Sequence, residues 1–260
     1  MNVGAQETAR RRLRLKVISC QVFCREIAEA MARTPSSVAV EFLSKGLHEI
    51  PPCLMRERLQ AAIDRVPAGD FDAIALAYGL CSHGTAGLRA GALPMVLPRA
   101  HDCLTLLLGS RARYREVFEE QPGTYFLSSG WIEHRRNPDE LRALSIAERH
   151  GMNAGFEELA ARHGEEQARW LVEQLGDQTR HYSRLAFIEM GIERSDRFER
   201  HAQAEAARHG WNFEKLRGDL SLLQRLLDGD WNAGDFQIIA PGQEVAAHYD
   251  ADSIITAHTP

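Results

Sequence analysis

Residues 73–84 read AIALAYGLCSHG, in which five small apolar residues run into a turn with two glycines, a cysteine and a histidine. An uninterrupted apolar run of this length is typical of a strand buried on both faces of a parallel sheet. The glycines allow the positive φ angles and close backbone contacts of a sharp turn. A second short apolar run, residues 95–97, leads in the same way into His101, Asp102 and Cys103. We therefore expect two adjacent strands that deliver thiols and imidazoles to one edge of a sheet.

The rest of the chain alternates short apolar runs with amphipathic segments. Strands and helices that alternate in this way predict an α/β fold, with a mainly parallel sheet flanked by helices. Further strands are expected at 13–19, 38–43, 124–127, 185–188 and 236–239, and helices at 22–31, 54–66, 138–181, 196–209 and 213–228, besides one that begins near residue 102.

Two segments of the chain are similar to each other. Residues 41–49, EFLSKGLHE, resemble residues 186–194, AFIEMGIER, and each segment is followed by an Asp-Phe pair and another apolar strand. The repeated order predicts two related Rossmann-like halves, with chance similarity between amphipathic α/β units as the alternative. We accordingly expect a flexible leader at 1–12, a first α/β half with the Cys/His site at 13–121, and a second α/β half at 122–260.

Composition narrows the class of protein. The 260 residues carry a net charge of −5, so the chain lacks the basic surface that nucleic-acid binding usually needs. No apolar run approaches the roughly 20 residues that span a bilayer, and residues 1–9 lack the apolar core of a secretory signal. Five widely spaced cysteines are an odd number for a disulfide framework and indicate reduced thiols. We expect a cytoplasmic protein without nucleic-acid or membrane partners.

Three of the cysteines, Cys20, Cys81 and Cys103, come directly after predicted strands, and His48 follows another. The carboxyl ends of parallel strands meet at one edge of an α/β sheet, where ligands bind. Three thiolates with a nitrogen or oxygen ligand suit zinc, and three thiolates with an open position suit an iron–sulfur cluster. The alternative is packing, because free cysteine is often a small buried hydrophobic residue and no C-x-x-C pair is present.

The neighbours of these cysteines offer catalytic and ligand-binding groups. His101 would act as a metal ligand, as a general base, or as a partner that lowers the pKa of Cys103. Asp102 is a second catalytic candidate, although Asp is also a preferred helix N-cap and a helix is expected to begin there. The candidates for ligand binding are hydroxyls, rings and charges close to predicted strand ends or turns: Tyr78, His83, Ser110, Arg111, Thr124 and Tyr125.

The chain resembles a family of proteins of unknown function, DUF1638, at residues 78–81, 101–103, 107–111 and 122–125, and also at 229–231 and 241–242. Proteins of this family look like companions of corrinoid-dependent methyltransferase systems that demethylate methylamines or betaines. The resemblance therefore implies a small-molecule ligand, or corrinoid methyltransferase components, as partners. The family pattern more often has Gly-Asn-Gly where this chain has Ser82-His83-Gly84, which weakens an essential role for His83.

Three functions are open at this point. The first is a metal-binding α/β protein, with zinc or an iron–sulfur cluster on the three cysteines, that serves corrinoid-dependent methyl transfer. The second is a metal-independent enzyme in which His101 activates the Cys103 thiol toward a small molecule. The third is a small-molecule binding module without catalysis. No Walker loop, G-x-G-x-x-G or G-x-S-x-G pattern is present, which removes common nucleotide-binding and hydrolase functions.

Overall fold

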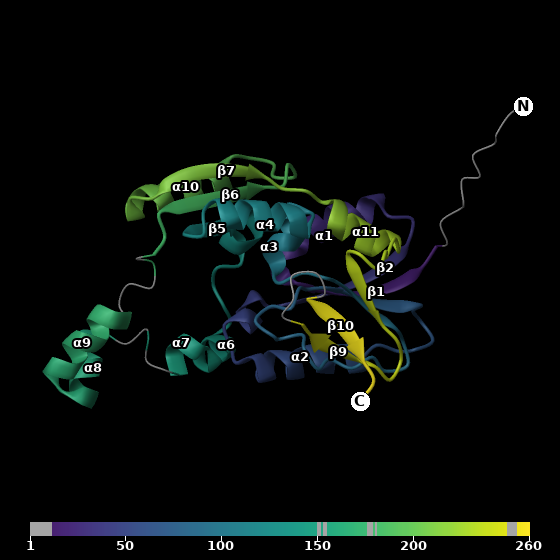
Figure 1. Cartoon of the computed structure of the whole chain (residues 1–260), viewed down its shortest axis with the longest axis horizontal. Helices are drawn as coiled ribbons and strands as arrows, with labels where there is room; N and C mark the ends of the chain where they lie inside the picture. The colour runs from purple at the N-terminus through teal and green to yellow at the C-terminus, as the bar shows by residue number, and fades with distance from the viewer. Residues whose placement is uncertain (1–11, 150–151, 153–154, 176–178, 180, 249–253) are drawn as a thin grey trace, which may run out of the picture.

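In a computed structural model, described for residues 12–149, 152, 155–175, 179, 181–248 and 254–260, the chain forms a five-stranded and a three-stranded β-sheet flanked by helices, together with a separate two-stranded hairpin (Figure 1). The fold is α/β with mainly parallel strands, as the sequence predicts. One hydrophobic core includes buried side chains from both sheets, so the sheets are packed into a single body. No helix in the described part of the chain is long and apolar enough to cross a membrane.

The first sheet contains the strands of the opening stretch. Its elements and the helices between them are β1 (Arg14–Cys20), η1 (Gln21–Phe23), α1 (Cys24–Arg33), β2 (Ser37–Leu43), η2 (Lys45–His48), α2 (Pro52–Asp64), β3 (Ala73–Ala77), β4 (Met95–Pro98) and β8 (Phe236–Ile239). The strand order is β2-β1-β3-β4-β8, in which β8 alone runs antiparallel to its neighbour. Every residue of β3 and β4 is buried, in agreement with their uninterrupted apolar sequences.

The second sheet has three parallel strands in the order β5-β6-β7. Its strands and nearby helices are α3 (Cys103–Leu108), α4 (Arg111–Glu120), β5 (Thr124–Ser128), α5 (Ser129–Glu133), β6 (Arg184–Glu189), α10 (Arg197–His209), β7 (Asn212–Arg217) and α11 (Ser221–Asp228). The helices predicted within 138–181 are α6 (Asp139–Leu144), α7 (Ile146–Arg149), α8 (Phe156–His163) and α9 (Glu165–Leu175). Figure 1 shows α8 and α9 packed against each other at one end of the molecule.

The sequence predicts one helix at 213–228, and this prediction is wrong for its first part. Residues 212–217 form β7, which pairs with β6. The spacing of Phe213 and Leu216 suits a helix, but backbone pairing with the exposed edge of β6 outweighs this local preference. Helix α11 begins only after Asp219, whose carboxylate accepts a hydrogen bond from the first amide of the helix at 2.8 Å.

One strand from the end of the chain belongs to the first sheet, although the sequence suggests that it follows the strands of the second. The strand predicted at 236–239 is present as β8, but it pairs with β4 and therefore belongs to the first sheet. The chain then ends in an antiparallel hairpin that the sequence did not indicate, β9 (Glu244–Ala247) and β10 (Ile255–His258). The division into halves at residue 121 stays a prediction, and residues 1–11 of the predicted leader lie outside the described residues.

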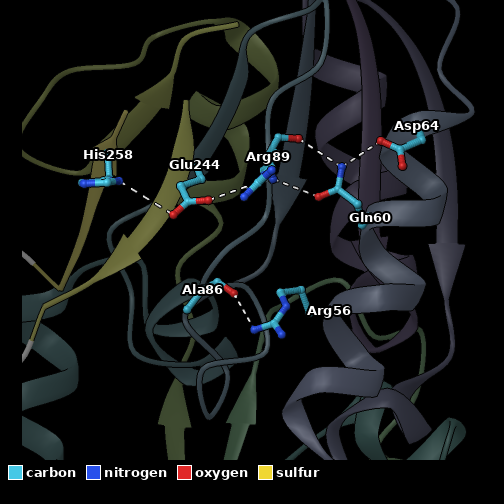
Figure 2. A network of polar contacts seen from close by, with 7 residues as sticks. All are labelled: Arg56, Gln60, Asp64, Ala86, Arg89, Glu244 and His258. Atoms are coloured by element: carbon cyan, nitrogen blue, oxygen red, sulfur yellow. Dashed lines mark hydrogen bonds and ion pairs between the residues drawn. The ribbon is translucent and has the colours of Figure 1, made fainter. Parts of the chain in front are cut away.

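A polar network attaches this hairpin to α2 (Figure 2). The Gln60 side chain donates to Asp64 Oδ1 at 2.8 Å and to the Arg89 carbonyl at 3.1 Å. Its own oxygen accepts from the Arg89 amide at 2.9 Å. Arg89 Nε in turn donates to Glu244 Oε2 on β9 at 3.2 Å. Gln60 and Arg89 together thus link the helix, the loop before β4 and the terminal hairpin.

We expect Gln60→Ala to lower the free energy of unfolding by about 1–2 kcal/mol, because three hydrogen bonds are lost together. Urea denaturation of the purified protein measures this loss. Gln203→Ala is the matched control, since its amide makes one long contact of 3.4 Å with Glu199 on an exposed face of α10. Equal losses in the two variants would show that the network does not hold the hairpin.

Candidate functional site

The turn after β3 contains three successive residues in the left-handed region. Cys81, Ser82 and His83 have φ angles of 47°, 54° and 69°, which side chains other than glycine rarely adopt. Each such residue costs roughly 1–2 kcal/mol, and strain of this kind gathers at functional sites. The Cys81 amide donates to the His101 carbonyl at 2.8 Å, which fixes the turn to the loop after β4. A Cβ at Gly79 would lie 2.8 Å from a backbone oxygen of that loop, so only glycine fits there.

The structure brings together the three cysteines that follow strands. Cys20 ends β1, Cys81 lies in the strained turn and Cys103 is the first residue of α3, and all three are buried as free thiols. Burial raises the pKa of all three. Beyond burial, Cys20 raises the pKa of Cys81, and both raise that of Cys103. Such mutual effects require the three thiols to lie near one another.

These thiols are neutral at physiological pH. Burial raises the pKa of Cys20 to about 12 and those of Cys81 and Cys103 well above their ordinary value. His48 Nε2 lies 3.3 Å from Cys20 Sγ, and burial lowers the pKa of His48 to about 4. The pair is therefore a neutral thiol beside a neutral imidazole. A buried neutral thiol is a poor nucleophile, whereas a bound metal replaces the thiol proton.

Tyr78 lies beside the same thiols. Its ring stacks on His48 with centroids 5.9 Å apart and the planes 25° from parallel. Burial raises the pKa of the Tyr78 hydroxyl, and all three thiols raise it further. The hydroxyl is fully buried and makes no hydrogen bond within the described part of the chain. An unsatisfied buried donor costs about 1–3 kcal/mol, which a bound group with sulfur or oxygen acceptors would offset.

Thiols are soft metal ligands, but these three are not arranged around one common position that a metal ion could occupy. Within the described ranges, no three His, Cys, Asp or Glu side chains are arranged to hold one metal ion. A single zinc ion needs all its ligands within about 2.0–2.3 Å of one centre. An iron–sulfur cluster spreads its thiolates over several irons, so its sulfur ligands lie farther apart. The described side chains therefore form no ready-made site for a single metal ion.

A cavity of about 400 Å³ lies between the two sheets, with Cys103 in its wall. The first sheet contributes His48 and the loop around η2, and the second contributes Thr124 and Tyr125 of β5 together with α5 and α10. Two predicted ligand-binding residues therefore line this cavity. The Thr124 hydroxyl is already engaged, because it donates to the Gln121 carbonyl at 2.6 Å.

Each side of the cavity carries one ion pair. Lys45 Nζ lies 2.5 Å from Glu49 Oε1 on the side of the first sheet, and Arg135 Nη1 lies 3.5 Å from Glu205 Oε2 on the side of the second. The ring of Tyr125 lies between aromatic neighbours, with its centroid 5.4 Å from that of Tyr182. The cavity thus combines aromatic faces with both signs of charge.

The remaining predicted residues lie elsewhere. Asp102 caps α3, where its carboxylate accepts from the Leu104 amide at 3.0 Å, and burial raises its pKa. His101 is exposed and lines a separate hollow together with Arg111. Ser110 caps α4 by accepting a hydrogen bond from the third amide of the helix, and His83 is exposed. None of these five side chains lines the cavity beside Cys103.

Several cavity residues escaped the sequence analysis. Lys45, Glu49, Arg135, Tyr182 and Glu205 come from four separate segments and form no local motif. A charged residue on an amphipathic segment usually faces solvent, so only the packing of the two sheets shows that these five face one space.

Comparison with known proteins gives one match. The model of a family described as "Protein of unknown function (DUF1638)" matches residues 42–227. Neither the curated proteins nor the solved structures contain a match to the chain.

Proposed function

This chain belongs to the DUF1638 family, and we propose that it binds an iron–sulfur cluster through Cys20, Cys81 and Cys103, with one iron open to the cavity between the sheets. The observation that carries the proposal is three buried free thiols close enough to raise one another's pKa. A cluster held in this way supplies single electrons and a free coordination position.

The protein's own residues would place a small molecule against that position. Cys103 is the thiol that lines the cavity, so a cluster held by it would lie beside the same space. The Tyr78 hydroxyl would donate to a cluster sulfur and His48 would stay neutral against Cys20, which limits the charge buried around the cluster. The cavity excludes bulk water on the sides formed by the two sheets.

We further propose that the protein serves corrinoid-dependent demethylation of methylamines or betaines in the cytoplasm, together with corrinoid methyltransferase components. The metabolic setting rests on the family resemblance. The cavity supports it chemically, because Tyr125, Tyr182 and Trp131 offer aromatic faces to a methylated ammonium group. The five free thiols suit a reducing compartment.

Electron paramagnetic resonance tests this proposal on protein isolated without oxygen and reduced with dithionite. We expect an iron–sulfur signal that shifts when cyanide is added, because an open iron takes up the anion. An iron–sulfur signal that cyanide leaves unchanged would contradict the open position. Zinc in place of iron would contradict the cluster and leave a zinc site on the same cysteines.

A metal-independent function is the second candidate, and the cavity itself favours it, because its shape and polar lining suit a small molecule whether or not a metal is bound. Metal-free protein with rapid alkylation of Cys103 would indicate an enzyme that uses this thiol. Metal-free protein with unreactive thiols would indicate a binding module.

A further inference from the structure

A second and larger hollow, of about 1030 Å³, lies at the carboxyl ends of β6 and β7. The first turn of α4, the start of α11 and the last residue of α1, Arg33, complete its rim. It shares no lining residue with the cavity beside Cys103, although α3 joins them: Cys103 at one end lines the cavity and Leu108 at the other lines the hollow. Carboxyl ends of parallel strands are where α/β proteins bind ligands.

Cationic side chains outnumber anionic ones in the lining of the hollow. Its lining contains four cationic and two anionic side chains, an excess of two positive charges, whereas the whole chain carries −5. Two of the arginines have ion-pair partners outside the lining, since Arg33 pairs with Glu29 and Arg113 with Glu116. The carboxylates in the lining are Glu189, which contacts Lys215 at 3.4 Å, and Asp219, which caps α11. Lys215 also pairs with Glu199 at 3.0 Å, so Arg217 is the one cation of the lining without an ion pair among the described residues.

Glycines in the loops after β6 and β7 bring the backbone close to the hollow. The Gly218 amide donates to the Glu189 carbonyl at 2.8 Å, which ties the loops after β6 and β7 together. A Cβ at Gly218 would lie 2.2 Å from Met190 Sδ and 3.2 Å from the Glu189 carbonyl oxygen, so the two loops pack closely. Gly191 has a φ angle of +72° and nothing within 4 Å of the place where its Cβ would be. Ten-residue α4 directs its amino end, the positive end of its dipole, toward the same space.

We propose that this hollow binds the phosphate groups of a small phosphorylated molecule, at a site separate from the thiol site. Its volume exceeds what a single inorganic ion needs and lies at the upper end of the range for small-molecule pockets. Phosphate suits it because several arginines surround the space, and the planar fork of arginine matches phosphate oxygens. The same cations, spread around a hollow instead of along a ridge, favour a compact ligand over a nucleic-acid strand.

Isothermal titration of the full-length protein with inorganic pyrophosphate tests the proposal. We expect saturable binding that Arg113→Ala and Arg217→Ala each weaken by about tenfold, the value of one charge-assisted hydrogen bond. Asp219→Asn is expected to tighten binding several-fold, because it removes a carboxylate from the lining while asparagine still caps α11. Arg200→Ala is the control, since it removes an equal charge from α10 outside the hollow.

Absence of binding at millimolar pyrophosphate would overturn the proposal. Equal weakening by Arg200→Ala and Arg217→Ala would overturn it as well, because the binding would then follow net charge alone. Tighter binding of an unstructured oligonucleotide than of pyrophosphate, with the same sensitivity to the two arginines, would assign the surface to nucleic acid. Circular dichroism of each variant shows whether the fold is kept. None of these outcomes depends on whether the thiol site holds a cluster.

Discussion

Cys81→Ser is expected to remove most of the iron from protein isolated without oxygen, at least about tenfold relative to wild type. Cys81 lies in the strained turn and is one of three thiols that we propose as cluster ligands. With three protein ligands, loss of one leaves two, and a serine hydroxyl at this buried position gives up its proton far less readily than a thiol. Cys20→Ser and Cys103→Ser are expected to give the same result.

Cys53→Ser is the matched control, because Cys53 is exposed in the first turn of α2. It is expected to retain wild-type iron. Iron that persists in all three buried variants, or that is lost equally in Cys53→Ser, would contradict the assignment of ligands. Near-ultraviolet circular dichroism of the metal-free proteins separates loss of a ligand from loss of the fold, since serine is close to cysteine in size.

Glu26→Gln is expected to stabilise the protein by about 2–3 kcal/mol at pH 8 and by much less at pH 5. Glu26 lies in the first turn of α1 with no exposed surface, and neither of its carboxylate oxygens has a hydrogen-bond partner among the described residues. Burial raises its pKa from 4.5 to about 7; beyond burial, Glu193 raises it and Arg25 lowers it.

The direction of the pH dependence follows from that shift. Because the pKa of Glu26 is higher in the folded than in the unfolded state, the folded protein holds the proton more tightly. Stability is then greatest below pH 4.5, falls as the pH rises to about 7, and stays low above it. A shift of this size corresponds to about 3 kcal/mol, which glutamine removes because it has no charge to bury.

Urea denaturation at pH 5 and pH 8 measures the effect, with Glu57→Gln on the exposed face of α2 as the control. The control is expected to change the unfolding free energy by less than about 0.5 kcal/mol at either pH. Equal stabilisation by Glu26→Gln at both pH values, or none at pH 8, would contradict a buried, ionising carboxyl at this position.

The first sheet could be predicted because its signals are local. The apolar run of β3 and its glycine-rich turn are contiguous in sequence, and so are β4 and the His101-Asp102-Cys103 segment. The rule that parallel strands end at one edge then places Cys81 and Cys103 together without further information. For the same reason Asp102 could be recognised from sequence as a possible helix cap.

The second sheet and the cavity depend on contacts between distant segments. The apolar spacing of Phe213 and Leu216 is compatible with a helix, and only pairing with β6 makes this segment a strand. Strand β8 begins at an Asp-Phe pair that resembles the one before β3. It nevertheless pairs with β4, which is far from it in sequence. Arg135 and Glu205 meet because α5 and α10 pack near each other, and no sequence spacing records that contact.

Iron and acid-labile sulfide in the wild-type protein, isolated without oxygen, test the cluster most directly. A cluster on Cys20, Cys81 and Cys103 predicts iron and sulfide in equal amounts, up to about four of each per chain. Protein that contains neither iron nor sulfide, both as isolated and after reconstitution with the two, would contradict it, and so would one zinc ion per chain.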